Sequence, residues 1–231
     1  MDVIKFFALT QSMASLARYS QTRLVAPESV LQHSGFVALA SYFITLEINS
    51  KAKNMNDELN IGQVLAHAIV HDLEESAVGD ISRPTKYHSK ETITMFHKLK
   101  TMAIRKVVKD LHLPPEVRSV VIQHHNEAKD GREGFIVDLA DKMAVVYKMW
   151  DECLLRGNYT VVKHAVHLHG HGFLPALRET LQQLHFNPEQ AFCLHGYLGN
   201  MDKLLAMVAA KQDDVHGIVE ELTQEEERQQ A

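Results

Sequence analysis

The feature that most constrains the fold is an apolar stripe at helical spacing, which recurs through almost the whole chain. Phe36, Val37, Ala40, Phe43 and Ile44 form one such stripe, whereas the strict alternation typical of strands is scarce. Glycine and proline residues separate the stripes and mark the breaks between them. The pattern predicts an all-α protein with helices near 2–18, 28–49, 61–77, 89–111, 115–126, 133–156, 159–168, 174–184, 188–211 and 213–228.

Composition excludes several classes of partner. The 231 residues are 45% hydrophobic and carry a net charge of −5, so no bulk field draws the chain to polymeric nucleic acid or to anionic membrane. No apolar run reaches the ~18 residues that a membrane span needs, and the N-terminus reads as an amphipathic helix, not a signal peptide. Cys153 and Cys193 are expected to be reduced thiols. We therefore expect a cytoplasmic protein.

One stretch, "LAHAIVHDLEESAVGDISRPTKY" at residues 65–87, crowds ionisable groups beside an apolar helical turn. His71-Asp72 follows Val70 directly, and further acids come shortly after. Burying charges without partners is costly. This edge of the helix therefore faces either solvent or something positive.

Two more polar residues lie on otherwise apolar helices. His33 precedes Phe36 and Val37 on their stripe, and Asp141 lies within "FIVDLADKMAVVYKMWDE". Singly, each has an ordinary explanation as a core histidine, a cap or an ion-pair partner. Together with His71-Asp72 they offer two imidazoles and two carboxylates from three helices. Such a mixed shell suits one divalent transition metal (Co, Mn, Zn, Fe or Ni) and suits Ca or Mg poorly.

These blocks resemble a known family. "RYSQTRLVAPESVLQHS", "HDLEESAVGDISRPTKY" and "DLADKMAVVYKMWDE", in this order, resemble the HD-domain metal-dependent phosphohydrolase superfamily, and within it the 5′-deoxynucleotidase branch. The resemblance spans roughly residues 10–155. We therefore expect one HD domain over 1–231, with its core at 10–155 and a helical extension at 156–231.

The resemblance implies His33, His71, Asp72 and Asp141 as the metal ligands. Asp138, three residues before Asp141, is the alternative for the last position.

Two neighbours of these ligands also bear on the expected site. Gln32 stands where the family usually has Glu before the first histidine, which bears on orientation of that ligand and not on metal binding. His67 lies one turn before His71 and is either a supporting or alternate ligand or ordinary packing.

Glu75 and Asp80 are the expected catalytic residues. A bound cation polarises a phosphoryl oxygen and activates water, and the departing 5′-oxygen then needs a proton. Glu75 follows His71 by four residues, which predicts one shared helix face and makes it the acid–base group, a role that the resemblance supports. Asp80, after the turn at Gly79, would position water or substrate.

Arg18, Tyr19, Lys86 and Lys90 are the expected substrate contacts. Arg18 and Lys86 would bind phosphate, and Tyr19 would pack on the sugar. The resembling family usually has Trp at the Tyr19 position, so this departure puts strict discrimination against ribonucleotides in question. Lys90, together with Arg83, would suit a longer triphosphate tail.

The sequence thus predicts a metal-dependent phosphohydrolase that cleaves the 5′-phosphoester of deoxynucleoside monophosphates. Alternatives are a dNTP triphosphohydrolase (such as a dATP triphosphohydrolase), a non-catalytic nucleotide-binding HD protein, and another phosphodiesterase. The last would need more second-metal ligands, for which "QHHNEAKDG" offers only His124 and His125. A binding module would not need Glu75.

The C-terminal helices carry fewer functional signals. A stripe of Met201, Leu204, Leu205 and Met207 is expected to be core or dimer surface, and the resemblance also suggests a homodimer. The histidines of 164–171 are expected to bind metal only adventitiously.

Overall fold

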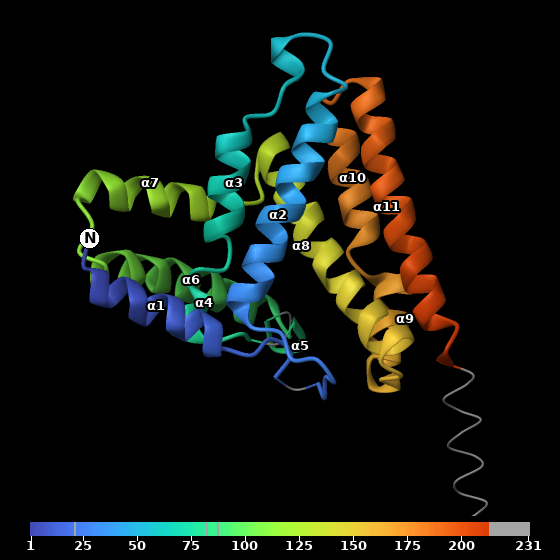
Figure 1. Cartoon of the computed structure of the whole chain (residues 1–231), viewed down its shortest axis with the longest axis horizontal. Helices are drawn as coiled ribbons and strands as arrows, with labels where there is room; N and C mark the ends of the chain where they lie inside the picture. The colour runs from blue at the N-terminus through green and yellow to red at the C-terminus, as the bar shows by residue number, and fades with distance from the viewer. Residues whose placement is uncertain (21, 82, 87, 213–231) are drawn as a thin grey trace, which may run out of the picture.

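A computed structural model of the chain describes residues 1–20, 22–81, 83–86 and 88–212 (Figure 1). Over these residues the protein is all-α, as predicted, and its single β-type contact is an isolated bridge between Ala17 and Ser29. The α-helices are α1 (Val3–Ser15), α2 (Val30–Asn49), α3 (Ile61–Val70), α4 (Glu75–Val78), α5 (Arg83–Lys86), α6 (Lys90–Asp110), α7 (Pro115–Asn126), α8 (Gly131–Trp150), α9 (Val162–His171), α10 (Leu174–Gln183) and α11 (Pro188–Ala209). Short 3₁₀ turns, η1 (Met55–Asp57) and η3 (Tyr159–Val161), and a π-turn, η2 (Asp151–Leu155), complete the described part.

Two predicted helix boundaries are wrong. The helix expected at 61–77 ends at Val70, because the His71 side chain contacts the Ala68 carbonyl at 2.7 Å and the chain turns before α4 begins at Glu75. The first helix ends at Ser15 and not near residue 18, because the following residues extend to pair with the segment before α2. The helix predicted at 213–228 lies outside the described residues.

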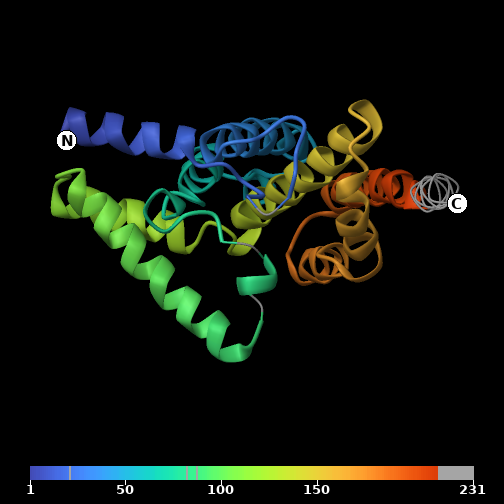
Figure 2. The same cartoon turned by 90° about the horizontal axis from the view of Figure 1, so that it is seen from below.

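Helices α2, α3 and α8 pack against one another in the middle of the molecule. On one side lie α1, α6 and α7, and on the other α9, α10 and α11 (Figures 1 and 2). Val37 and Ile44 of α2 and Leu139 of α8 are buried in a core that continues to Leu198 and Leu205 of α11. The C-terminal helices therefore share the core of the central ones, and the division into a core and an extension stays a prediction.

Several smaller predictions can be checked in the same structure. None of the described helices has both the length and the apolar character needed to cross a membrane. No disulfide joins Cys153 and Cys193, as predicted. The stripe on α11 is divided: Met201 is buried, whereas Met207 is 50% exposed.

A buried carboxylate anchors the loop between α1 and α2. Glu152 in η2 is fully buried and accepts hydrogen bonds from the backbone amides of Val25 (2.7 Å) and Ala26 (2.9 Å). It also accepts from Asn158 Nδ2 (2.7 Å) and Lys148 Nζ (2.9 Å). Four donors satisfy this carboxylate, which fixes the loop that leads from Arg18 to the start of α2.

We predict that Glu152→Gln lowers the free energy of unfolding by about 3 kcal/mol, because one member of a buried charged cluster is lost while its partners stay buried. Urea unfolding at neutral pH measures this. The exposed Glu179 of α10 is the matched control, and E179Q should change stability by less than about 0.5 kcal/mol. Equal stability of E152Q and the wild type would contradict the anchoring role.

The same carboxylate gives the pH dependence of stability a defined sign. Burial alone would raise the pKa of Glu152, but the hydrogen bonds from Asn158, Lys148 and the two amides lower it from 4.5 to about 2. A lowered folded-state pKa stabilises the protein above pH 4.5, and this contribution is lost as the pH falls towards 2. As the pH falls from 4.5 to about 2, the free energy of unfolding of the wild type should decrease more than that of E152Q.

Candidate functional site

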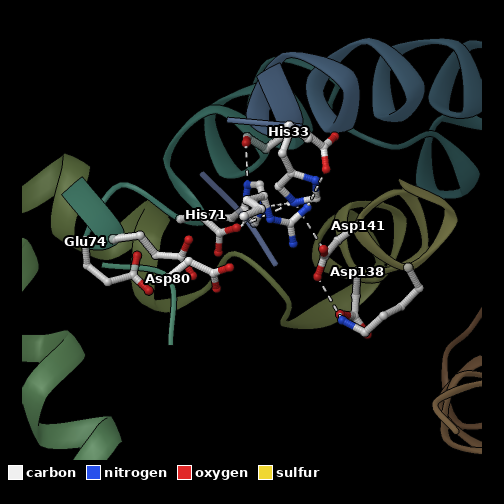
Figure 3. A network of polar contacts seen from close by, with 12 residues as sticks. His33, His71, Glu74, Asp80, Asp138 and Asp141 are labelled. Atoms are coloured by element: carbon white, nitrogen blue, oxygen red, sulfur yellow. Dashed lines mark hydrogen bonds and ion pairs between the residues drawn. The ribbon is translucent and has the colours of Figure 1, made fainter. Parts of the chain in front are cut away.

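The four residues predicted as ligands lie together where α2, the end of α3 and α8 meet (Figure 3). His33 and His71 are buried, and their Nε2 atoms lie 3.4 Å apart. Asp72 Oδ2 lies 3.2 Å from Nε2 of His71 and 3.5 Å from that of His33. Asp141 Oδ1 lies 3.2 Å from His33 Nε2. One ligand atom each from His33, His71 and Asp72 fits within 4.8 Å, and Asp141 joins them through His33.

Local hydrogen bonding orients His71. Its Nδ1 lies 2.7 Å from the carbonyl of Ala68, and since a carbonyl only accepts, Nδ1 carries the hydrogen. In the neutral ring Nε2 then holds a lone pair that faces His33 and Asp72. Burial, the largest cause, lowers the pKa of His33 and favours its neutral form. Burial alone would also lower the pKa of His71, but the charge of Asp72 and its hydrogen bond to the ring raise it. Metals bind the neutral imidazole, so a cation held here would take the place of the Nε2 proton of His71.

The two carboxylate oxygens of Asp141 face different groups. While Oδ1 faces His33, Oδ2 lies 2.5 Å from Lys129 Nζ and 2.8 Å from Lys142 Nζ. Burial would raise the pKa of Asp141, but the two ammonium groups hold it well below its usual range. Asp138 contacts the same lysines at 3.1 and 3.0 Å and lies farther from the histidines in Figure 3. Of the two candidate acids, Asp141 is thus the one that reaches the histidines.

Asp72 is also held as an anion. Burial favours its neutral form, but the His71 charge and the hydrogen bond to that ring keep the pKa of Asp72 well below its usual range. A buried carboxylate, that of Asp141, and a partly buried one, that of Asp72, therefore face two imidazoles in one small volume. This donor set of two nitrogens and two oxygens fits a divalent transition metal.

Glu75 lies beside this cluster, although it does not share a helix with His71 as predicted. It opens α4 after the turn, it is 5% exposed, and its Oε1 lies 3.5 Å from Lys86 Nζ. Burial, and then the charge of Asp72, raises the pKa of Glu75 to about 8. Glu75 is consequently protonated at neutral pH and can donate a proton.

Asp80 holds the chain that follows α1. It comes directly after Gly79, whose φ of 82° is readily adopted only by glycine, and its Oδ2 accepts a hydrogen bond from the Tyr19 amide at 3.0 Å. Tyr19 itself has a φ of 57°, an uncommon conformation that this hydrogen bond helps to hold. The contact fixes the Arg18-Tyr19 segment near the turn that carries Asp72 and Glu75.

The predicted substrate residues divide into two groups. Arg18 contacts Glu28 at 3.4 Å and lies over the Tyr19 ring, and although burial opposes its charge, Tyr19, Asp72 and Asp141 raise its pKa. Lys86 reaches Glu75. In contrast, Lys90 is exposed at the start of α6, and among the described residues no contact joins it to the cluster. The side chain of Arg83 lies outside the described part.

Histidines outside the cluster have other partners. His67 is fully buried, and its ring meets that of His124 with centroids 5.2 Å apart, so it faces α7 and not the ligands. His125 Nε2 lies 2.7 Å from Glu74 Oε2. Within the 164–171 cluster, the side chains of His169 and His171 are not described.

The sequence does not indicate that Glu74, Lys100 and His125 lie together beside the site. Glu74 is fully buried, and Lys100 and His125 contact it from α6 and α7. His125 belongs to a motif that the sequence does single out. Lys100 gives no signal, because it is one of several lysines on a long amphipathic helix.

Comparison with known proteins agrees with this geometry. A sequence model of the family described as 5′-deoxynucleotidase YfbR-like matches residues 5–168. A 5′-deoxynucleotidase of Erwinia tasmaniensis is 31% identical over 159 residues, which cover 66% of this chain and 75% of that protein. A 5′-deoxynucleotidase of Vibrio parahaemolyticus is 29% identical over 158 residues, covering 67% of this chain and 77% of its own.

Solved structures show the same fold. An HD-domain phosphohydrolase from Listeria innocua has a TM-score of 0.68 and 22% identity, covering 97% of this chain and 100% of its own. An HD phosphohydrolase of cyanophage S-2L, bound to dA and one catalytic Zn²⁺ ion, has a TM-score of 0.54 and 16% identity over 85% of this chain and 95% of its own.

The sequence match and the fold lead to one assignment and confirm the resemblance seen in the sequence. The chain is a hydrolase that acts on phosphoester bonds; it has the fold of the HD-domain phosphohydrolases and belongs to the YfbR-like 5′-deoxynucleotidase family.

Proposed function

We propose that the protein hydrolyses the 5′-phosphoester of deoxynucleoside monophosphates with one divalent transition metal held by His33, His71, Asp72 and Asp141. The observation that carries this proposal is the convergence of two imidazoles and two carboxylates in one small cluster. The deoxynucleotidase relatives support the substrate class. A metal bound there would polarise a phosphoryl oxygen and lower the pKa of a bound water.

The chain's own residues would do the remaining work. Glu75, protonated at neutral pH, donates its proton to the departing 5′-oxygen. Arg18 and Lys86 bind the phosphate, whose charge of about −2 near pH 7 they and the metal neutralise. Asp80 positions the segment that carries Arg18 and Tyr19 through its hydrogen bond to the Tyr19 amide. Tyr19 packs against the sugar.

Triphosphate hydrolysis is the second candidate. Lys90 and Lys98 line one shallow depression on α6 together with Glu91, Thr94 and Met95, which is where a longer phosphate tail would find cations. Non-catalytic nucleotide binding is the candidate of another class, and the buried proton donor Glu75 argues against it. A homodimer and a cytoplasmic location stay predictions.

Product analysis distinguishes these functions. Protein loaded with Co²⁺ or Mn²⁺ is incubated with deoxy- and ribonucleoside mono- and triphosphates, and the products are separated by chromatography. We expect deoxynucleoside and orthophosphate from the deoxy monophosphates. Intact triphosphate released from a dNTP would establish the second candidate, and bound nucleotide without any product would contradict both enzymatic functions.

The variant Glu75→Gln controls this assay. It keeps the shape of the side chain but removes the proton, so turnover should fall by about 10²- to 10⁴-fold. Metal affinity should stay within a few-fold of the wild type. The exposed Glu116 of α7 is the matched control, and E116Q should retain full turnover.

Metal affinity separates the two candidate acids of α8. We predict that Asp141→Asn weakens Mn²⁺ binding by more than about 100-fold, whereas Asp138→Asn, which changes only a partner of Lys129 and Lys142, weakens it at least tenfold less. Isothermal titration calorimetry measures both. A larger loss in D138N than in D141N would reverse the assignment.

The two lysines of the predicted substrate site should behave differently. Lys86→Gln removes the cation beside Glu75, so KM for a deoxynucleoside monophosphate should rise about tenfold or more. Lys90→Gln should leave this KM within about twofold, since Lys90 has no described contact with the cluster. If K90Q raised KM as much as K86Q, Lys90 would have to reach the substrate.

A further inference from the structure

A buried carboxylate that the proposed reaction does not use lies within the catalytic turn. Glu74 is fully buried and stands between Asp72 and Glu75 in the sequence. Its backbone and theirs form the turn that replaces the predicted continuation of α3. The side chains of Asp72 and Glu75 leave this turn in different directions: Asp72 faces the histidines and Glu75 faces Lys86.

Two helices that are distant from Glu74 in the sequence contact its side chain. Lys100 Nζ of α6 lies 2.5 Å from Oε1, and His125 Nε2 of α7 lies 2.7 Å from Oε2, so each carboxylate oxygen has its own partner. Burying a carboxylate fully is costly without such partners, so the two contacts hold Glu74 in its place between α6 and α7.

The backbone of the turn is held less firmly. Its bonds are short-range contacts from the Leu73 amide to the Val70 carbonyl and from the Glu75 amide to the Asp72 carbonyl, both at 3.1 Å. Bonds of this i to i+3 type have poorer geometry than those of an α-helix. The side-chain contacts of Glu74 tie the turn to α6 and α7, in addition to the bond that Ser12 Oγ of α1 donates to the Ser76 carbonyl at 3.1 Å.

We propose that Glu74 is a positioning residue that, held by Lys100 and His125, fixes the turn so that Asp72 faces the histidines and Glu75 faces Lys86. The inference rests on the proposed function, because it gives those two neighbours their roles. It also assigns a task to α6 and α7, which contribute none of the four predicted ligands. Through the Glu74 carboxylate, the packing of α6 and α7 affects the positions of Asp72 and Glu75.

The test compares Glu74→Gln with Glu179→Gln, an exposed glutamate of α10. Mn²⁺ affinity is measured by calorimetry, kcat and KM by phosphate release, and thermal stability by circular dichroism. We expect E74Q, at a temperature where it is fully folded, to bind Mn²⁺ about 10- to 100-fold more weakly and to lose kcat by a similar factor, with KM little changed. E179Q should match the wild type in every readout.

A purely structural role gives a different result. In that case E74Q melts at a lower temperature but, once folded, keeps the Mn²⁺ affinity and kcat of the wild type, and this would overturn the proposal. If E74Q does not fold, His125→Gln and Lys100→Met take its place, since each removes one contact and should show a smaller loss of the same kind. The losses measured for the two single variants should not simply add in the double variant H125Q/K100M, as they would for independent sites.

The two proposals fail in distinguishable ways. A wild-type protein that hydrolyses no nucleotide contradicts the proposed function, yet the loss of Mn²⁺ affinity in E74Q still tests the positioning role. An active wild type with unchanged E74Q metal binding contradicts the positioning role alone.

Discussion

Two carboxylates that face two imidazoles, one of them buried and the other partly buried, must be balanced by positive charge, and much of the structure is arranged around this requirement. Lys129 and Lys142 neutralise the outer oxygen of Asp141, while its inner oxygen faces His33. Asp72 turns its own oxygen to both imidazoles. The charges that surround the cluster therefore keep both acids ionised and leave the inner donor atoms directed at one another.

The elements that supply these groups differ in how they are held. His33 and Asp141 lie on long helices whose apolar residues pack into the shared core, so their positions follow from the packing of α2 against α8. His71, Asp72 and Glu75 lie on a broken helix, and Arg18 and Tyr19 lie on a loop. For these, single polar contacts take the place of packing: Asp80 to the Tyr19 amide and Glu152 to the far end of the loop. Two of the four predicted ligands therefore lie on rigid helices, whereas the other two and the predicted substrate contacts lie on shorter segments.

The helices could be predicted from the sequence for physical reasons, and so could the candidate site residues His33, His71, Asp72 and Asp141. Apolar periodicity predicts α2 and α8 closely, and it identifies His33 and Asp141 as polar residues on buried faces. The break after Val70 was missed because "LEESAV" has no proline or glycine and its residues favour a helix. The contact of the His71 side chain with the Ala68 carbonyl, three residues earlier in the chain, marks the place where the helix ends. The roles of the adjacent acids Glu74 and Glu75 also depend on this break. Their opposite surroundings, Lys100 and His125 on one side and Lys86 on the other, come from residues far apart in the sequence.

Anomalous diffraction from crystals of the Mn²⁺-loaded protein tests the central claim most directly. The account predicts one strong peak among His33 Nε2, His71 Nε2, Asp72 and Asp141 Oδ1, at distances typical of metal coordination. A peak that Asp141 does not contact, or an ion bound instead at His67 and His124, would contradict it.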